Sequence, residues 1–438
     1  MPEFRDRPRL IAGVIFAGVV AVFLPALRFP FLNWDDRVNI VENVLLRFDG
    51  PGLSFMLTGN RLGHWQPLSW LSLALDRAVW GAEPLGYHLT AVLLHAAAAV
   101  LLFFLARALK LGALPSAFAA LLWAFHPLRV ESVAWVTERR DVLSGAVALG
   151  AALAYVRGLV DPVWRRRAFV LTVLAMTAKV FAIVLPAVWL LLDLRLAGAP
   201  RWREKLPYVP AALGVLALNI AAQQGSGASV SFANFGLTHR LAQAFYGLAF
   251  YPWKTLIPTG LAPLYEYSIL LEPRPFTVAA ACVSTFAFFL ALTRSRADGL
   301  VQASLAYAVL LLPALGLFKS GRMIAADRWS YLPAIPLALL AGAALGRIRD
   351  ARAARAVAAF VLLALALASR RQLPVWSSDT ALWTRAVEAS PMSYFALERL
   401  AEAEDAAGRP GEAAGRRAHA AALRRFVADL SVRVRAGL

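Results

Sequence analysis

The chain has 438 residues, of which 60% are hydrophobic and 16% are charged, and its formal net charge is +18. A soluble protein carries about 25% charged residues, so this composition excludes an ordinary soluble domain. The apolar residues gather in repeated blocks of about 15–22, the length that crosses a hydrocarbon core of about 30 Å. Most arginines lie in short clusters between these blocks, as in the cytoplasmic loops of a membrane protein, and not on one soluble face, as in a nucleic-acid binder.

Cysteine and histidine usage narrows the chemistry further. The single cysteine, Cys282, lies in an apolar block, so no disulfide can form within this sequence. Six scattered histidines leave no Cys/His spacing typical of zinc. Three arginines, Arg5, Arg7 and Arg9, precede the apolar run 10–27, as in a signal peptide. Because many more apolar blocks follow, we expect a retained anchor.

The apolar blocks predict an all-α polytopic membrane protein of about eleven spans. The expected spans are 10–27, 87–106, 113–126, 141–156, 168–178, 180–193, 207–223, 275–292, 299–318, 330–346 and 356–369. With the N-terminus cytoplasmic, the basic clusters between spans fall inside the cell. If 240–257 also crossed, the last two clusters would move outside. We therefore expect that segment, interrupted by Pro252 and Pro258, to be re-entrant or to lie on the surface.

The same topology divides the chain into a membrane domain, 1–371, and a soluble tail outside the membrane, 372–438. It places the outer loops at 28–86, 127–140, 224–274 and 319–329. The tail is rich in Ala, Glu and Arg, and its helices are expected at 379–389, 393–407 and 411–428. Their spacing is close to the period of about 34 residues of tetratricopeptide repeats. Because little more than one repeat fits, the tail should pack on the membrane domain or on a partner.

Ionisable residues at the outer face mark the candidate site. A carboxylate there can act as general base toward a hydroxyl, and Arg or Lys can hold a phosphate. Lys179 lies between two apolar runs, which is costly unless its ammonium is paired or hydrated. A phosphate above apolar helices implies a lipid-linked phosphate. The catalytic candidates are Asp35 and Asp36; the phosphate ligands would be Arg139, Arg140, Lys179 and Arg328; the supporting residues would be His64, His126, Glu131, Asp141 and Asp327.

Each candidate also has a purely structural interpretation. Asp141 would cap the N-terminus of the fourth span, where a carboxylate offsets the helix dipole. Arg139 and Arg140 would be anchors that extend toward the membrane surface. The two aspartates would form a solvated turn, and the two histidines would be structural. A divalent cation (Mg or Mn) held by the aspartate pair is a further hypothesis, although no full ligand set is visible.

Several motifs resemble those of a known family. They are Asn33-Trp-Asp-Asp, His64-Trp-Gln-Pro-Leu-Ser-Trp-Leu, Gly86-Tyr-His-Leu-Thr, His126-Pro-Leu-Arg-Val-Glu through Glu138-Arg-Arg-Asp, Tyr251-Pro-Trp-Lys and Ala326-Asp-Arg-Trp-Ser-Tyr-Leu-Pro. Over about residues 25–395 the chain resembles bacterial relatives of the transmembrane and tetratricopeptide O-mannosyltransferases, in the C-type glycosyltransferase superfamily. It departs from them in its short tail, which puts repeat-based docking of a protein acceptor in doubt.

This resemblance implies an enzyme that uses a polyprenyl-phosphate-linked sugar, mannose or a similar hexose, at the outer face. It places the catalytic aspartate at Asp35 or Asp36, which the sequence does not rank, and phosphate-facing residues at Lys179, Asp327 and Arg328. The acceptor would be a protein or an envelope glycan, and the location a bacterial inner membrane. The alternatives are a scaffold or transporter whose tail recruits periplasmic partners, and an enzyme acting on another lipid-linked group.

Overall fold

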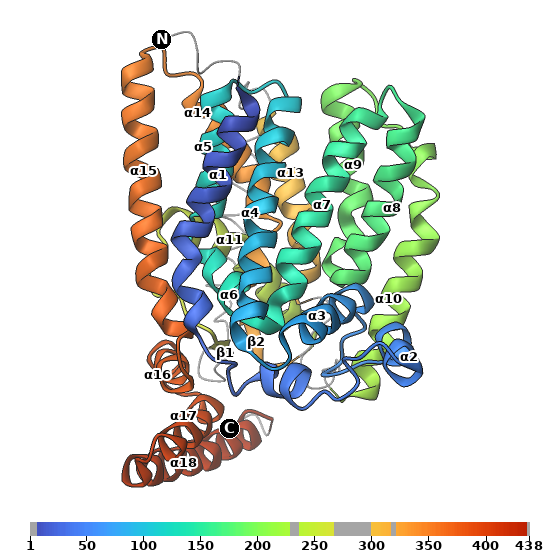
Figure 1. Cartoon of the computed structure of the whole chain (residues 1–438). Helices are drawn as coiled ribbons and strands as arrows, with labels where there is room; N and C mark the ends of the chain where they lie inside the picture. Colours follow the sequence, from blue (N-terminus) through green and yellow to red (C-terminus); the bar gives the residue numbers. More distant parts are fainter. Residues whose placement is uncertain (1–6, 228–235, 267–298, 317–320, 436–438) are drawn as a thin grey trace.

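The computed structural model describes residues 7–227, 236–266, 299–316 and 321–435. Its long helices lie side by side along one axis (Figure 1). They are α1 (Pro8–Phe23), α4 (Pro84–Ala108), α5 (Ala113–Ala124), α7 (Arg139–Gly158), α8 (Pro162–Ala178), α9 (Leu185–Leu196), α10 (Tyr208–Gly225), α13 (Leu300–Leu311), α14 (Ala334–Leu345) and α15 (Ala351–Gln372). The helical class expected from the sequence is confirmed.

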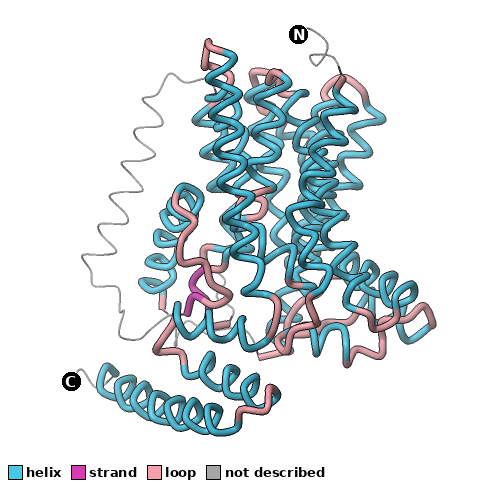
Figure 2. Tube along the Cα trace, turned by 60° about the vertical axis from the view of Figure 1, so that its left-hand side comes forward, coloured by secondary structure: helices cyan, strands magenta, loops and turns pink. Residues whose placement is uncertain are grey.

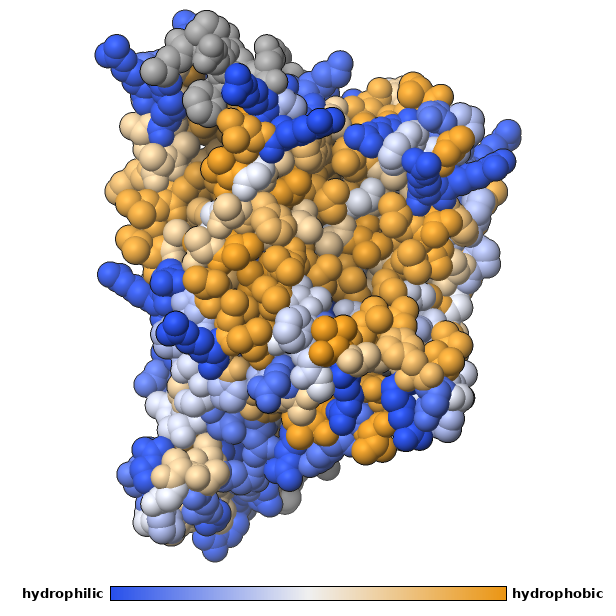
Figure 3. Space-filling model, in the orientation of Figure 1, coloured by the Kyte–Doolittle hydropathy of each residue, from blue (hydrophilic) through white to orange (hydrophobic). Residues whose placement is uncertain are grey.

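Membrane spanning is supported by the length and composition of these helices. Within the described residues, 5 helical stretches are long and apolar enough to cross: Pro8–Arg28, Pro84–Ala108, Val136–Gly158, Trp202–Gly225 and Ala351–Trp376. An apolar band crosses the bundle between two polar ends (Figure 3). A helix lies at each predicted span except 275–292, which with Cys282 falls outside the described residues. The chain is a multi-pass membrane protein, and the count of eleven spans stays a prediction.

The junction of α8 and α9 differs in detail from the two short spans that the sequence suggests. Helix α8 begins at Pro162, because the carboxylate of Asp161 accepts a hydrogen bond from the amide of Val163 at 2.8 Å. It ends at Lys179, whose backbone is extended (φ −150°, ψ 127°). A 3-10 turn, Val180–Val184, then leads into α9. The helical path is therefore interrupted at Lys179, which lies between the end of α8 and the 3-10 turn.

The segment 240–257 lies in one continuous helix, α11 (Leu237–Leu256), so the interruption expected at Pro252 is not observed. A proline inside a helix leaves the carbonyl four residues earlier without its usual donor. Here the hydroxyl of Tyr307, in α13, donates to the carbonyl of Leu248 at 3.1 Å. This contact between two helices compensates for the missing backbone bond.

Short elements close one end of the bundle, at the bottom of Figure 1. They are α2 (Gly50–Thr58), α3 (Pro67–Trp80), α6 (Val130–Ala134) and the antiparallel strands β1 (Tyr265–Glu266) and β2 (Met323–Ala325). The strand pair joins two predicted outer loops that lie far apart in the sequence. We call this end of the bundle the outer end.

The predicted soluble tail forms the helices α16 (Asp379–Ala389), α17 (Tyr394–Ala406) and α18 (Pro410–Arg435). The first two are close to the predicted ranges, and α18 continues beyond the predicted end at 428. They lie beyond the outer end of the bundle (Figure 2). The tail packs on the membrane domain: the amide of Asn33 donates to Asp379 Oδ1 at 2.7 Å, and the rings of Trp34 and Trp383 lie 5.0 Å apart. Its relation to tetratricopeptide repeats stays a prediction.

Candidate functional site

A cavity of about 350 Å³ opens at the outer end, where the four predicted outer loops, the junction of α8 and α9, and the tail meet. We call it the ionic cavity. The charged side chains among its described lining residues are the cations Arg140, Lys179, Arg322 and Arg328 and a single carboxylate, Asp35. Aromatic rings fill much of the remaining wall: Trp34, Trp65, Trp135, Phe181, Trp329 and Phe395. The cavity therefore offers an anion a cationic surface with one carboxylate beside it.

The structure separates the two candidate aspartates. Asp35 lines the ionic cavity, whereas Asp36 is buried beside the second outer loop. Asp36 accepts hydrogen bonds from the amide and the hydroxyl of Thr137, at 2.8 and 2.6 Å, and from the amide of Leu32, at 3.1 Å. Only Asp35 is placed to meet a molecule in the cavity.

Burial shifts the pKa values of the two aspartates and of a histidine that lines the cavity. Burial raises the pKa of Asp35 above its ordinary value, while the nearby charges of Arg140 and Arg328 act in the opposite direction. Burial raises the pKa of Asp36 to about 7. His64 lines the cavity, and burial together with Arg140 lowers the pKa of its imidazole well below the usual range, so the ring is neutral at pH 7.

Glu138 lies behind the cavity wall and contacts three of the cations that line it. Its carboxylate pairs with Arg140 at 2.5 Å and with Lys179 and Arg328 at 3.2 Å each. Glu138 is fully buried and does not itself line the cavity. One carboxylate thus contacts three of the cations that line the cavity. Glu138 directly precedes Arg139 and Arg140 in the sequence, but nothing in that spacing predicts that it contacts three cations.

Two further carboxylates complete the ionic network. The Nζ atom of Lys179 lies 2.5 Å from Asp141 Oδ1, so of the two alternatives expected for this lysine, pairing or hydration, the structure shows pairing. Asp141 also accepts a hydrogen bond from Ser132 at 3.2 Å. Arg328 pairs with Glu131, which also accepts the Arg328 backbone amide at 2.8 Å. These contacts fix the two cations that come from outside α7.

The unused hydrogen-bonding capacity in this network belongs to Arg140. Its Nη1 atom is buried and has no hydrogen-bond partner in the described part of the chain. Such a donor is costly to bury unless a ligand or water satisfies it. Arg140 therefore lines the cavity and also carries a buried donor that no described residue satisfies.

Arg139, selected as a phosphate ligand from the sequence, is not among the residues that line the ionic cavity. Its guanidinium pairs with Asp76 at 2.6 Å and donates to the carbonyl of Tyr87 at 2.5 Å. It also donates to the hydroxyl of Ser72 at 3.1 Å. These partners fasten the start of α7 to α3 and α4, so Arg139 supports the site through the fold.

The remaining supporting candidates also lie outside the cavity wall. His126 caps the turn Pro127–Arg129 by accepting the Leu128 amide at 3.3 Å, and its Nε2 lies 2.9 Å from the Thr255 carbonyl. Asp327 accepts the hydroxyl of Tyr265 at 2.9 Å. Within the described ranges, no group of three or more His, Cys, Asp or Glu side chains is arranged to hold a metal ion.

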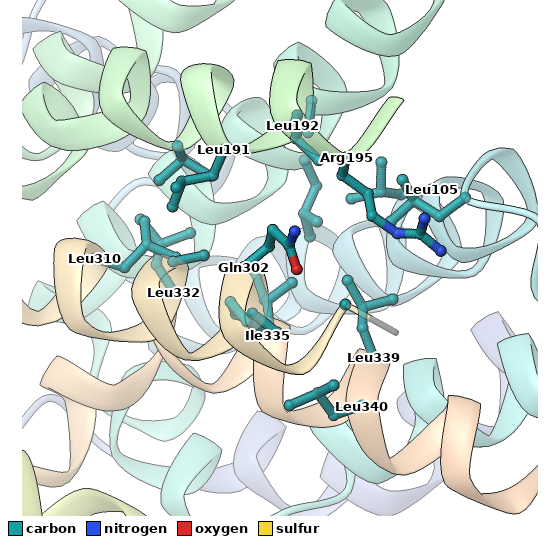
Figure 4. Close-up of a pocket in the computed structure, with 18 of the residues that line it drawn as sticks. Leu105, Leu191, Leu192, Arg195, Gln302, Leu310, Leu332, Ile335, Leu339 and Leu340 are labelled. Atoms are coloured by element: carbon teal, nitrogen blue, oxygen red, sulfur yellow. The ribbon is translucent and has the colours of Figure 1, made fainter. Parts of the chain in front are cut away.

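A second cavity of about 200 Å³ lies between helices of the bundle (Figure 4). It is lined almost entirely by aliphatic side chains of α4, α7, α9, α13 and α14, with Arg195 and Gln302 as polar exceptions. A third cavity of about 10 Å³ shares Lys179 and Arg328 with the ionic cavity, and Leu310 and Leu332 with the apolar one. The ionic and the apolar environments are therefore adjacent in the structure.

A row of stacked tryptophans fixes the segment that carries Asp35. The ring of Trp34 lies 4.5 Å from Trp135, and Trp135 lies 5.6 Å from Trp376. Trp383 of the tail packs on the other side of Trp34. The sequence analysis did not select these residues, since nothing in their spacing indicates that they stack.

The fold and the site together define a multi-pass helical membrane protein with an ionic cavity at one end and an apolar cavity between its helices.

No protein-family model matches the chain. Curated relatives are protein O-mannosyl-transferases, which confirms the resemblance expected from the motifs. The chain is 34% identical over 166 residues to Tmtc1 of Drosophila melanogaster, covering 35% of this chain and 19% of that protein.

Two vertebrate relatives give the same result. The chain is 37% identical to TMTC2 of Mus musculus and 36% identical to TMTC2 of Homo sapiens, each over 158 residues, 34% of this chain and 19% of the relative. These matches thus span about a fifth of the relatives' length. Among solved structures, ArnT from Cupriavidus metallidurans bound to undecaprenyl phosphate is similar with a TM-score of 0.43 and 15% identity, covering 93% of this chain and 74% of that one.

Proposed function

We propose that the chain is a membrane glycosyltransferase that moves a sugar from a polyprenyl-phosphate-linked donor to an acceptor hydroxyl. The observation that carries the proposal is the ionic cavity, where one carboxylate, Asp35, faces the same space as four cations. The names of the relatives, protein O-mannosyl-transferases, support mannose or a similar hexose as the sugar. The proposal also includes an outward-facing site in a bacterial cytoplasmic membrane.

The donor would be held by its phosphate and its apolar tail. Arg140, Lys179 and Arg328 supply cationic hydrogen-bond donors, and paired donors of this kind bind phosphate strongly. The small third cavity, which Lys179 and Arg328 line, also touches Leu310 and Leu332 of the aliphatic cavity. A phosphate at the three cations would therefore leave its lipid chain in an apolar environment.

The transfer step follows from this placement. The Asp35 carboxylate accepts the proton of the acceptor hydroxyl, and the hydroxyl oxygen forms a bond to the anomeric carbon of the sugar. The bond from that carbon to the phosphate oxygen breaks, and its electron pair leaves with the polyprenyl phosphate. The three cations neutralise the charge that develops on the phosphate. Attack from the face opposite the phosphate would invert the anomeric configuration.

The experiment uses the purified full chain in lipid nanodiscs with radiolabelled polyprenyl-phosphate mannose. The acceptor is an envelope extract from the source strain after deletion of the gene, which keeps the natural acceptors unmodified. We expect label to transfer to the extract, and Arg140→Gln to raise the half-saturating donor concentration about tenfold. Arg417→Gln, an exposed arginine of α18, is the matched control and should change nothing.

A scaffold or transporter would give a different result. It would neither bind the lipid-linked donor through Arg140 nor transfer or hydrolyse its sugar. If the wild-type chain leaves the donor intact and does not bind it, the proposed function is wrong. If it transfers another sugar in place of mannose from the same lipid carrier, only the assignment of the hexose changes.

A further inference from the structure

The soluble tail supplies part of the ionic cavity. Phe395, in the first turn of α17, is the one described lining residue that comes from beyond α15. Its ring packs edge-on against Trp383 of α16, with the ring centroids 5.6 Å apart. The tail therefore reaches the site itself and does more than extend from the end of the bundle.

A cation stacked on the tail forms the adjacent part of the same wall. The guanidinium carbon of Arg322 lies 4.8 Å from the ring centre of Phe395 and 5.2 Å from that of Tyr394. Arg322 also pairs with Glu266 at 3.4 Å, in the strand β1. The stack joins α17 to the strand pair, because Arg322 directly precedes β2.

Two hydrogen bonds, one from α16 and one from its C-terminal cap, fasten the tail to this wall. Arg385 Nε donates to the carbonyl of Leu261 at 2.9 Å, and the hydroxyl of Ser390 donates to the carbonyl of Leu264 at 3.2 Å. Leu264 lines the ionic cavity as well. These bonds hold α16, against which the Phe395 ring packs, next to the cavity.

Position separates this wall from the donor path. The third cavity, which adjoins the apolar cavity at Leu310 and Leu332, is lined by Lys179 and Arg328 but by neither Arg322 nor Phe395. Under the proposed function, the donor occupies the side that continues into the bundle. The acceptor hydroxyl must then approach from the side that the soluble tail supplies.

We infer that Phe395 and Arg322 form the acceptor-binding wall of the ionic cavity. The inference rests on the proposed function and extends it. The Phe395 ring offers an apolar face on which a sugar or side chain of the acceptor packs, and Arg322 offers guanidinium donors for its polar groups. In this account the tail selects and positions the acceptor from within the active site.

The test compares Phe395→Ala with Phe426→Ala, an exposed phenylalanine of α18 that does not line the cavity. Full-length variants in nanodiscs receive radiolabelled polyprenyl-phosphate mannose and increasing amounts of the envelope extract described above. We expect Phe395→Ala to need about five to ten times more extract for half-maximal transfer, as for truncation of an aromatic anchor. Binding of polyprenyl phosphate should change less than about twofold, because the donor cations are untouched. Phe426→Ala should match the wild type.

Conservative replacement separates binding from folding. Phe395→Tyr keeps the ring and should restore the half-saturating amount of extract. The inference is overturned if Phe395→Ala has wild-type acceptor dependence, or if it loses polyprenyl-phosphate binding to the same extent as acceptor use. Failure of the wild-type chain to bind or use the donor would instead overturn the proposed function.

Discussion

Asp36 and Thr137 lie in different predicted outer loops, and the Asp36 carboxylate accepts both the amide and the hydroxyl hydrogen of Thr137, at 2.8 and 2.6 Å. This double contact fastens the first loop to the second. Both oxygens of the Asp36 carboxylate are occupied, since the second oxygen accepts the amide of Leu32. The two adjacent aspartates therefore divide into one structural residue and one cavity residue.

Removing the Thr137 hydroxyl tests whether Asp36 has a structural role. Thr137→Val should lower the free energy of unfolding by about 1–2 kcal/mol, because a buried carboxylate loses one of its donors. Unfolding in mixed micelles measures the change. Thr58→Val is the control, since the Thr58 hydroxyl donates only to an exposed helical carbonyl. Equal stability of Thr137→Val and wild type would contradict the assignment.

The pKa of Asp35 predicts how activity depends on pH. Burial raises this pKa above its ordinary value of 3.8. A general base acts only when ionised, so kcat/KM should increase about tenfold per pH unit below that raised pKa and level off above it. Asp49→Asn, at an exposed helix cap, should keep this acidic limb. A flat profile down to pH 4 in the wild type would show that Asp35 is not the base.

Lys179 should contribute to both stability and donor binding, and a double substitution separates the two effects. Lys179→Met leaves the buried Asp141 carboxylate without its cation, which should cost about 3–5 kcal/mol of unfolding free energy. It should also weaken polyprenyl-phosphate binding about tenfold. Adding Asp141→Asn should recover much of the stability and none of the binding. Recovery of both would limit Lys179 to a structural role.

The helices of this protein could be predicted well from its sequence. Apolar blocks of spanning length coincide with the described helices of the bundle, and the tail helix Asp379–Ala389 has the predicted bounds 379–389. Lys179 was selected because an unpaired lysine between apolar runs is costly, and its partners are present. These signals are local in the sequence, so periodicity and single residues reveal them.

The direction of each side chain could not be predicted in the same way. Asp35 and Asp36 are neighbours, and only the turn of the loop decides which one faces the cavity. Arg139 pairs with Asp76, 63 positions earlier, and α11 continues through Pro252 because Tyr307 satisfies a distant carbonyl. These outcomes depend on contacts between remote segments, which one sequence without tertiary contacts does not specify.

Removal of divalent metal ions tests whether the aspartate pair holds a cation. The Asp36 carboxylate is occupied by Thr137 and Leu32, and the cavity already has its own cations. We therefore expect transfer to continue at more than half the wild-type rate in excess EDTA. Loss of activity in EDTA that returns with Mg²⁺ or Mn²⁺ would place a metal in the mechanism.

The most direct test of the account is sugar transfer by the purified Asp35→Asn protein, with Asp36→Asn compared in parallel. Loss of a general base should reduce kcat by about 10²–10⁴ while the protein stays folded and binds polyprenyl phosphate as the wild type does. Asp36→Asn should lower the free energy of unfolding and still transfer sugar at a measurable rate. Wild-type transfer by Asp35→Asn would contradict the central claim that this carboxylate activates the acceptor.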